Sequence, residues 1–332
     1  MPRWFEGVRL NFAENLLFSC FAGDTTGKED IQIAVTEVRE GAADQAVHLN
    51  WGELRRRTGL LMRAMRENGV AKGDRIAVCS ANSIDTLLVF LAATGVGGIF
   101  SSSSTDMGVK GILDRMLQIK PRWLFMDDQA VYNGKIVDLR GKMGDIVRGM
   151  QFVQEFQGVV SQPRFKSQSA DISRTPMTLS LSDFLAKGAA SDVPAKFERV
   201  GFCDPFLIVY SSGTTGQPKC IVHSVGGVLL TAHKEGGLHQ ELGPDSVSLQ
   251  YTTTGWIMYL SAIQTLIFGS RVVLYDGSPF LPEVSSLISL VEQERRDTLT
   301  SAKIQIIFLA VSQGYTFRNI TALSPRITEV AY

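Results

Sequence analysis

Hydrophobic positions along the chain follow two spacings: short continuous runs, typical of buried strands, and repeats of three and four residues, typical of helices. Asn50 can cap a helix that Gly69 ends. Leu54, Leu61 and Met65 then share one face of that helix. Further helices are predicted over residues 82–94, 106–118, 226–239, 257–268 and 283–293. Strands are predicted over residues 75–79, 122–126, 205–209, 220–223, 246–251 and 271–275, with another beginning at residue 99.

Strands and helices alternate along most of the chain, which predicts the α/β fold class. Helices that connect parallel strands cover both faces of a sheet, so a mostly parallel sheet with flanking helices is the most economical arrangement. The polar, aperiodic residues 161–176 are interpreted as a surface loop, and a second polar stretch, residues 188–196, leads into the later strands. We therefore expect one α/β subdomain over residues 1–196 and a second over residues 197–294.

Composition and charge exclude several function classes. The chain has 332 residues, 45% of them apolar, which is enough for the core of one large or two ordinary domains. Lys and Arg number 33, as do Asp and Glu, and the arginine runs are not interleaved with aromatic residues, so we expect no nucleic-acid partner. The longest apolar run, residues 87–100, contains glycines and is shorter than the ~18 residues of a membrane span. We therefore expect no membrane span.

Cysteine and histidine usage indicates the cytosol and no metal site. Cys20, Cys79, Cys203 and Cys220 are far apart, form no C-x-x-C pair and lie in or beside apolar runs, which is typical of reduced core residues. The four histidines show no zinc-ligand spacing. The amino terminus lacks the basic start and apolar core of a signal peptide. A cytoplasmic protein is therefore expected, and the sequence leaves its oligomeric state open.

One hydroxyl-rich loop carries the strongest functional signal. Residues 210–219 read Tyr-Ser-Ser-Gly-Thr-Thr-Gly-Gln-Pro-Lys and lie between two apolar runs, so they predict a strand, a tight loop and a second strand. The glycines permit positive φ and close approach to a ligand, and the hydroxyl and backbone N–H groups can hold phosphate oxygens. The lysine adds a flexible positive charge. The predicted phosphate-binding residues are Ser211, Ser212, Gly213, Thr214, Thr215, Gly216 and Lys219.

The loop is not a Walker A motif, because Gln217 and Pro218 separate Gly216 from Lys219. Its order, Ser-Ser-Gly-Thr-Thr-Gly-x-Pro-Lys, resembles the phosphate loop of the adenylate-forming (AMP-dependent synthetase/ligase) superfamily, which includes acyl-CoA synthetases and luciferases. The resemblance implies stacked, mostly parallel β-sheets with flanking helices, as in the large N-terminal domain of acyl-CoA synthetases. It also implies that the loop cradles the β- and γ-phosphates of ATP and that Lys219 serves catalysis by offsetting their charge.

Two further segments narrow this resemblance. Residues 4–17, Trp-Phe-Glu-Gly-Val-Arg-Leu-Asn-Phe-Ala-Glu-Asn-Leu-Leu, are similar to the amino-terminal segment of the acetyl-CoA and acetoacetyl-CoA synthetase branch. Residues 252–256, Thr-Thr-Thr-Gly-Trp, resemble its acyl-pocket segment, which implies that Thr254, Gly255 and Trp256 bind the substrate. The alternative for Trp256 is a tryptophan of the hydrophobic core. The four serines at residues 101–104 lie where a strand gives way to a helix and are interpreted as helix-capping and loop residues, the alternative being that their hydroxyls meet a ligand.

The resemblance implies a reaction in two steps. A short acyl or keto acid, acetoacetate, is activated with ATP to an acyl-adenylate and pyrophosphate, and the thiol of coenzyme A then displaces AMP. The expected enzyme is an AMP-forming acid-thiol ligase, with Mg²⁺ bridging the phosphate oxygens. No catalytic base is required, because a carboxylate is already a nucleophile at neutral pH. The predicted partners are therefore small molecules: acetoacetate, ATP and coenzyme A.

The last part of the chain departs from this family pattern. Residues 295–332 do not match it, and the segments that hold adenine, ribose and Mg²⁺ in family members, as well as the small C-terminal domain, are absent from the sequence. The sequence therefore predicts a fragment, a splice form or a mispredicted product of an acetoacetate-CoA ligase, with little turnover on its own. The alternative is a non-catalytic relative that binds a nucleotide or a partner.

Overall fold

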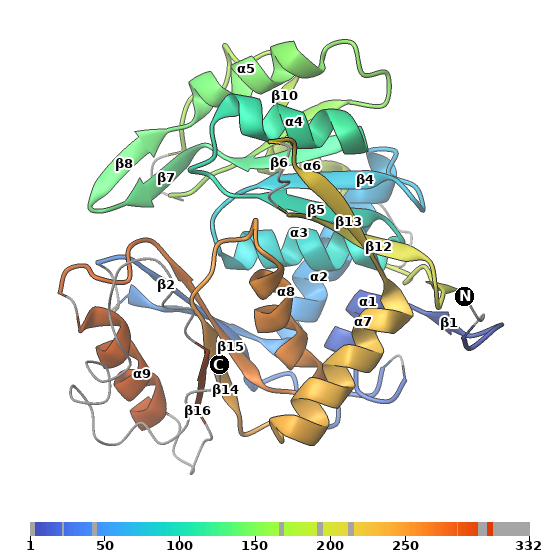
Figure 1. Cartoon of the computed structure of the whole chain (residues 1–332), viewed down its shortest axis with the longest axis vertical. Helices are drawn as coiled ribbons and strands as arrows, with labels where there is room; N and C mark the ends of the chain where they lie inside the picture. The colour runs from blue at the N-terminus through green and yellow to red at the C-terminus, as the bar shows by residue number, and fades with distance from the viewer. Residues whose placement is uncertain are drawn as a thin grey trace.

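The computed structural model describes residues 4–21, 23–41, 45–165, 169–190, 195–211, 216–283, 285–297 and 304–307. Within these ranges, two large β-sheets are stacked with helices between and outside them (Figure 1). The helical segments are α1 (Phe12–Leu17), α2 (Trp51–Glu67), α3 (Ile84–Gly95), α4 (Val109–Ile119), α5 (Arg140–Met150), α6 (Leu181–Ala189), α7 (Val225–Ala232), the π-helix η2 (His233–His239), α8 (Ile257–Ile263), the 3₁₀-helix η3 (Gln264–Phe268) and α9 (Ser286–Asp297).

The strands confirm the predicted fold class. They are β1 (Arg9–Leu10), β2 (Ile33–Arg39), β3 (Val47–Asn50), β4 (Arg75–Cys79), β5 (Ile99–Ser103), β6 (Trp123–Asp127), β7 (Gln129–Tyr132), β8 (Lys135–Asp138), β9 (Gly158–Gln162), β10 (Thr178–Ser180), β11 (Val200–Gly201), β12 (Pro205–Ser211), β13 (Lys219–Ser224), β14 (Val247–Gln250), β15 (Arg271–Asp276) and β16 (Ile304–Ile307). The seven-stranded sheet has the order β10-β9-β6-β4-β5-β12-β13 and is parallel except for β12 with β13. The five-stranded sheet has the order β16-β14-β15-β2-β3 and is parallel except for β2 with β3.

Both large sheets take strands from either side of residue 196. The seven-stranded sheet adds β12 and β13 to strands from the first part of the chain, and the five-stranded sheet adds β2 and β3 to strands from the last part. The predicted boundary between residues 196 and 197 therefore does not coincide with a boundary between the sheets. The pairing of β16 with β14 also places residues beyond 294 in a sheet.

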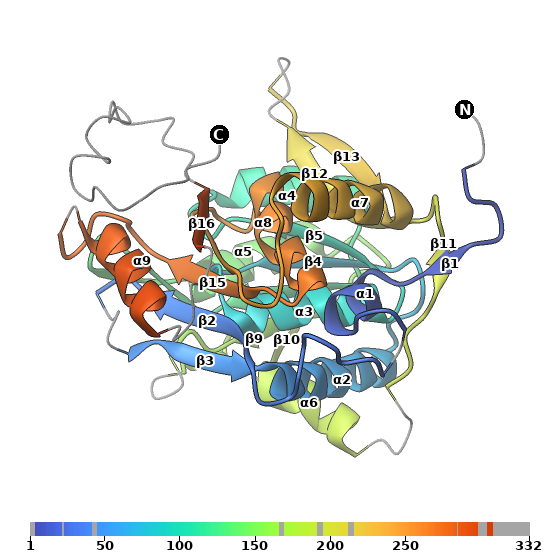
Figure 2. The ribbon, with the colours of Figure 1, turned by 90° about the horizontal axis from the view of Figure 1, so that it is seen from below.

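Hydrophobic side chains fill three layers. A first cluster, with Ile112 and Met143, joins α4 and α5 to one face of the seven-stranded sheet. The largest cluster lies between the two sheets, where Phe90 of α3 packs edge to face against Phe100 of β5 at 4.6 Å between ring centroids. A third cluster, with Leu287, joins α9 to the outer face of the five-stranded sheet (Figures 1 and 2). Burial on both faces explains why most strands are continuous apolar runs.

The helix predicted after Asn50 is confirmed. The Asn50 side chain accepts the backbone N–H of Glu53 at 2.8 Å, and the three predicted core residues Leu54, Leu61 and Met65 are buried. The helices predicted over residues 226–239 and 257–268 each change type along their length. α7 continues as the π-helix η2, and α8 continues as the 3₁₀-helix η3. These continuations touch each other, and a Cβ on Gly236 would lie 2.2 Å from the ring of Phe268.

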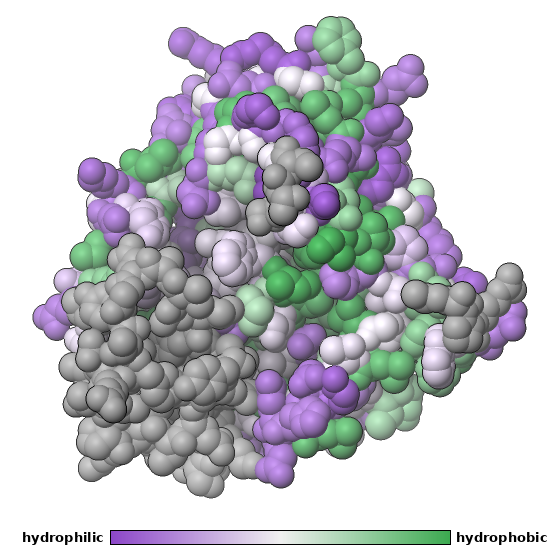
Figure 3. All heavy atoms as spheres, viewed as in Figure 1, coloured by the Kyte–Doolittle hydropathy of each residue, from purple (hydrophilic) through white to green (hydrophobic). Residues whose placement is uncertain are grey.

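The edge of the seven-stranded sheet is apolar. β13 has no neighbour on its outer side among the described strands, and its residues Ile221 and Val222 are exposed. Figure 3 shows apolar side chains gathered over β13 and the start of α8, where Ile257 is also exposed.

The cysteine prediction is correct for one residue. Cys79 is buried and Cys220 is half-buried. Cys20 and Cys203 are exposed, because they lie in turns beside the apolar runs and not within them. All four are free thiols. In the described part of the chain, no helix is long and apolar enough to cross a membrane.

Candidate functional site

The predicted phosphate loop begins at the end of β12 and ends at the start of β13, two strands that lie side by side at the edge of the sheet (Figure 2). Ser211, the last residue of β12, pairs with Lys219, the first residue of β13. Gly216 has a φ of +84°, which favours glycine, and a Cβ there would meet no atom within 4 Å. The exposed Lys219 side chain makes no hydrogen bond or ion pair within the described ranges. The four remaining predicted residues, Ser212, Gly213, Thr214 and Thr215, lie outside the described residues.

The base of this hairpin is fixed to the carboxyl end of β5. Ile208 of β12 pairs with Ser101 of β5, and the Ser101 hydroxyl donates to the Ile208 carbonyl at 3.0 Å. The ring of Tyr210 packs under the Arg115 guanidinium at 5.1 Å, and burial raises the pKa of Tyr210 to about 12. Since β5 and β12 are parallel and in register, Ser211 ends its strand beside the end of β5. The predicted loop therefore starts at the carboxyl edge of the sheet, where α/β proteins bind ligands.

The interpretation of the four serines as cap and loop residues is wrong for the first three and holds for Ser104, which follows β5 as a loop residue. Residues 101–103 belong to β5 and are buried, and α4 begins later, with Gly108 as its N-cap. The Ser102 hydroxyl donates to the carbonyl of Thr254, whose own hydroxyl donates to the carbonyl of Ser80 at 2.8 Å. Small hydroxyl side chains suit this position because they bond to backbone where the ends of the two sheets meet.

The predicted substrate-binding residues Thr254, Gly255 and Trp256 lie where this contact is made. A Cβ on Gly255 would lie 3.0 Å from the backbone nitrogen of Ser104, so glycine permits the close approach of the two segments. Trp256 is 63% exposed and precedes α8, so the alternative of a core tryptophan is wrong. Substrate binding by these three residues stays a prediction.

A cavity of about 410 Å³ lies between the carboxyl ends of the two sheets. Its volume falls in the range of roughly 300–1,000 Å³ that is common for small-molecule sites. The seven-stranded sheet contributes residues 80–82 and 104–106, and the five-stranded sheet contributes residues 251–254 and 275–277. The remaining lining residues are Ala130, Val131, Tyr132, Val137, Leu139 and Lys142. Of the predicted site residues, Thr254 lines this cavity.

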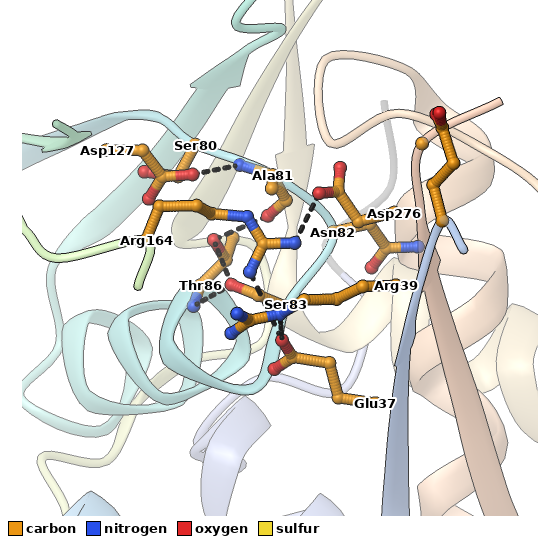
Figure 4. A network of polar contacts seen from close by, with 12 residues as sticks. Glu37, Arg39, Ser80, Ala81, Asn82, Ser83, Thr86, Asp127, Arg164 and Asp276 are labelled. Carbon is orange, nitrogen blue, oxygen red and sulfur yellow. Dashed lines mark hydrogen bonds and ion pairs between the residues drawn. The ribbon is translucent and has the colours of Figure 1, made fainter. Parts of the chain in front are cut away.

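A buried charge cluster lies behind the cavity and bridges the two sheets (Figure 4). Arg164 follows β9 of the seven-stranded sheet and is 3% exposed. Its guanidinium pairs with Glu37 of β2 at 3.3 Å and with Asp276 of β15. The predicted surface loop at residues 161–176 is therefore wrong for its first residues, because β9 extends to Gln162 and Arg164 enters the interior to pair with these carboxylates.

The carboxyl groups of this cluster differ in their titration. Burial raises the pKa of Asp127 to about 7. Two contacts act in the opposite direction and favour the charged carboxylate: the nearby Arg164, and the backbone N–H of Ala81, which donates to Asp127 at 2.8 Å. Burial also raises the pKa of Asp276. For Glu37, burial favours a higher pKa, but Arg164, the backbone N–H of Ile84 and Arg39 together outweigh it, and the pKa lies below its ordinary value. Although burial opposes it, the surrounding carboxylates raise the pKa of Arg164, which therefore stays charged.

The described residues contain no group of three or more His, Cys, Asp or Glu side chains that could hold a metal ion. Proteins often bind Mg²⁺ through one or two carboxylates together with substrate phosphates. The predicted Mg²⁺ therefore stays a prediction that depends on bound phosphate.

With this geometry in place, the comparisons with known proteins are informative. A family profile described as AMP-binding enzyme matches residues 30–313. The chain belongs to the AMP-binding enzyme family. The predicted superfamily is confirmed, and the family match extends past residue 294, where the sequence analysis ended it.

Several proteins similar to this chain are named as acetoacetyl-CoA synthetases. The chain is 41% identical over 296 residues to "Acetoacetyl-CoA synthetase" of Danio rerio, covering 88% of this chain and 42% of the relative. It is 37% identical over 302 residues to "Acetoacetyl-coenzyme A synthetase" of Rhizobium meliloti (strain 1021), covering 91% and 44%. The solved structure "Acetoacetyl-CoA Synthetase from Streptomyces lividans" matches with a TM-score of 0.76 and 31% identity, covering 93% of this chain and 49% of that one. The chain thus spans less than half the length of these relatives.

Two parts of the site, the β7–β8 turn and Arg164, were not predicted from the sequence. The pair Asn133-Gly134 separates β7 from β8, and an Asn-Gly pair between short apolar runs is a strong hairpin signal that could have been used. Arg164 carried no usable signal, because an arginine in a polar stretch is normally exposed.

Proposed function

We propose that this chain carries the phosphate loop and part of the substrate site of an AMP-forming ligase that joins acetoacetate to coenzyme A. The observation that carries the proposal is the identity of 41% and 37% with relatives named acetoacetyl-CoA synthetase and acetoacetyl-coenzyme A synthetase, over 88% and 91% of this chain. The geometry is compatible with it, because the cavity and Lys219, which has no partner within the described ranges, both lie at the carboxyl edge of the sheets.

In this proposal, each end of the site has its own task. Backbone N–H groups and hydroxyls of residues 211–216 hold the β- and γ-phosphates of ATP, and Lys219 offsets the charge that grows on the leaving pyrophosphate. Bound Mg²⁺ would neutralise part of the phosphate charge. Thr254, Gly255 and Trp256 contact the acid, whose carboxylate attacks the α-phosphorus. Coenzyme A is the second substrate, and the cytosol is the proposed location.

The proposal is tested by incubating the purified chain with acetoacetate, MgATP and coenzyme A, and by following pyrophosphate release and acetoacetyl-CoA formation. Release that depends on acetoacetate and exceeds that with acetate or butyrate supports the ligase, even if turnover is slow. Lys219→Ala should abolish it. Binding of MgATP without pyrophosphate release, whichever acid is supplied, would favour the non-catalytic, nucleotide-binding alternative.

A further inference from the structure

The hairpin formed by β7 and β8 stands apart from both large sheets. It is a separate two-stranded sheet, and Figure 1 shows it projecting at the left side of the molecule, above β2. Its residues Tyr132, Ile136 and Val137 are exposed. An isolated two-stranded hairpin is marginally stable in water, so contacts outside the hairpin must fix its position.

The base of the hairpin is fixed to the seven-stranded sheet. Leu139, just after β8, donates its N–H to the carbonyl of Asp128, just before β7, at 2.9 Å. The Asp128 carboxylate accepts the backbone N–H groups of Arg164 and Ala170, each at 2.8 Å. These bonds hold the base but leave the tip unsupported.

The tip is held by the carboxylate of Glu40. This side chain accepts the N–H of Asn133 at 3.0 Å and the N–H of Gly134. The two turn residues have positive φ values of 51° and 71°, as in the turns that favour Asn-Gly. Successive backbone N–H groups in such a turn can point toward one anion, and here the anion is Glu40.

Glu40 is bonded to the end of the other sheet. It follows β2, its backbone N–H donates to the carbonyl of Asp276 at 2.9 Å, and its carboxylate also accepts the N–H of Ser278 at 2.6 Å. Gly277 leaves room for this arrangement, because its φ is +120° and an added Cβ would lie 2.3 Å from the Cβ of Glu40. Glu40 therefore connects the hairpin tip to the end of the five-stranded sheet.

We propose that Glu40 is a positioning residue that holds the β7–β8 hairpin in place as the outer wall of the cavity. Four hairpin residues, Ala130, Val131, Tyr132 and Val137, line the cavity, whose other walls come from the two large sheets. The hairpin is anchored to one sheet at its base and, through Glu40, to the other sheet at its tip. Release of the tip opens the cavity without disturbing the hydrophobic core.

Hydrogen–deuterium exchange of the full chain tests the position of the hairpin. Glu40→Ala removes the acceptor for three N–H groups and should speed exchange in residues 129–138 and 276–280 by about tenfold or more, whereas β4 should be unchanged. Glu40→Gln offers one carbonyl oxygen in place of two carboxylate oxygens and should give an intermediate effect. Hydroxyl-radical labelling of Tyr275, which is 4% exposed, should rise in parallel.

Asp24→Asn is the matched control. Asp24 also accepts two backbone N–H groups, from Thr26 at 3.0 Å and Cys20 at 3.1 Å, but its loop does not line the cavity. This variant should leave exchange in residues 129–138 unchanged. Unchanged exchange there in Glu40→Ala would overturn the proposal. Faster exchange throughout the chain with a lower unfolding midpoint would also overturn it, since Glu40 would then stabilise the fold as a whole.

A functional readout rests on the proposed ligase activity. In Glu40→Ala, the KM of acetoacetate or coenzyme A should rise at least about threefold with little change in kcat, because a cavity wall is displaced and no reacting group is removed. The KM of MgATP should stay unchanged, because its loop lies on the β12–β13 hairpin. Three unchanged KM values would contradict the assignment of the hairpin to the binding cavity. A parent chain that forms no thioester would count against the ligase proposal alone, because the exchange experiment does not depend on it.

Discussion

Two hairpins flank the candidate site, and their turns differ in how polar groups are satisfied. In the β7–β8 hairpin, both N–H groups of the Asn133-Gly134 turn are bound by Glu40 of the same chain. In the β12–β13 hairpin, Gly216 faces open space and Lys219 has no partner among the residues that the structure describes. The N–H groups of the first turn bind a carboxylate of the same chain, which fixes the turn in place. The second keeps its cation available, which is what binding an external phosphate requires.

The two turns show that one sequence motif predicts a function and the other predicts only a turn. Glycine, hydroxyl groups and a nearby lysine define the β12–β13 loop in the sequence, whereas Asn-Gly predicts a turn without predicting what its N–H groups bind. The partner, Glu40, lies 93 residues from Asn133 in sequence, so only the fold brings the two together.

The buried arginine that stands behind the cavity should have the largest effect. Arg164→Met leaves Asp276 buried without its cation and Glu37 with only the Arg39 ion pair at 3.0 Å, and should lower the free energy of unfolding by roughly 3–5 kcal/mol. Urea denaturation of parent and variant measures this change. The triple variant Glu37→Gln, Arg164→Met, Asp276→Asn removes the unpaired charges and should recover most of the loss. Failure of this neutral variant to recover stability would show that the packing of Arg164 matters more than its charge.

Asp127 should contribute an effect on stability that grows with pH and approaches that of Arg164 only near neutral pH. Its pKa is about 7 in the folded protein against an ordinary value of 3.8, so between these pH values the folded chain keeps a proton that the unfolded chain releases. The parent therefore loses stability as pH rises through this window. Asp127→Asn cannot titrate and lacks this loss. Its free energy of unfolding should therefore rise relative to the parent by up to about 1.4 kcal/mol for each pH unit within this window.

Urea denaturation of both proteins from about pH 4 to about pH 8 measures this difference. The gain should be complete above the folded pKa and absent below the unfolded one. Stability curves that run parallel across the whole range would contradict the raised pKa of Asp127.

Trp256 should have the smallest effect on stability. Its side chain is 63% exposed, so Trp256→Ala should change the free energy of unfolding by no more than about 0.5 kcal/mol. In contrast, if Trp256 borders the acid, the relative kcat/KM for acetate, acetoacetate and butyrate should change about tenfold in a full-length relative that carries this segment. A large stability loss with unchanged acid preference would assign Trp256 to packing.

The fold was largely predictable from the sequence, because apolar runs and helical repeats directly reflect burial between layers. The helix after Asn50 and the β4, β6 and β15 strands follow from local patterns. The site was only partly predictable. Residues 101–103 look like a polar loop and are a buried strand, because their hydroxyls bond to Ile208 and Thr254, which are distant in sequence. Polar residues that are buried through long-range pairing leave no local pattern.

The central claim, that the β12–β13 loop is an open phosphate site, is tested most directly by calorimetric titration of the full chain with MgATP. The parent should bind MgATP measurably. In Lys219→Ala the free energy of binding should weaken by roughly 1.5–3 kcal/mol, the value of a hydrogen bond to a charged group. The free energy of unfolding should be unchanged, because the Lys219 side chain is exposed and makes no contact that stabilises the described fold. Identical MgATP affinity of parent and Lys219→Ala would contradict the assignment of this loop to phosphate binding.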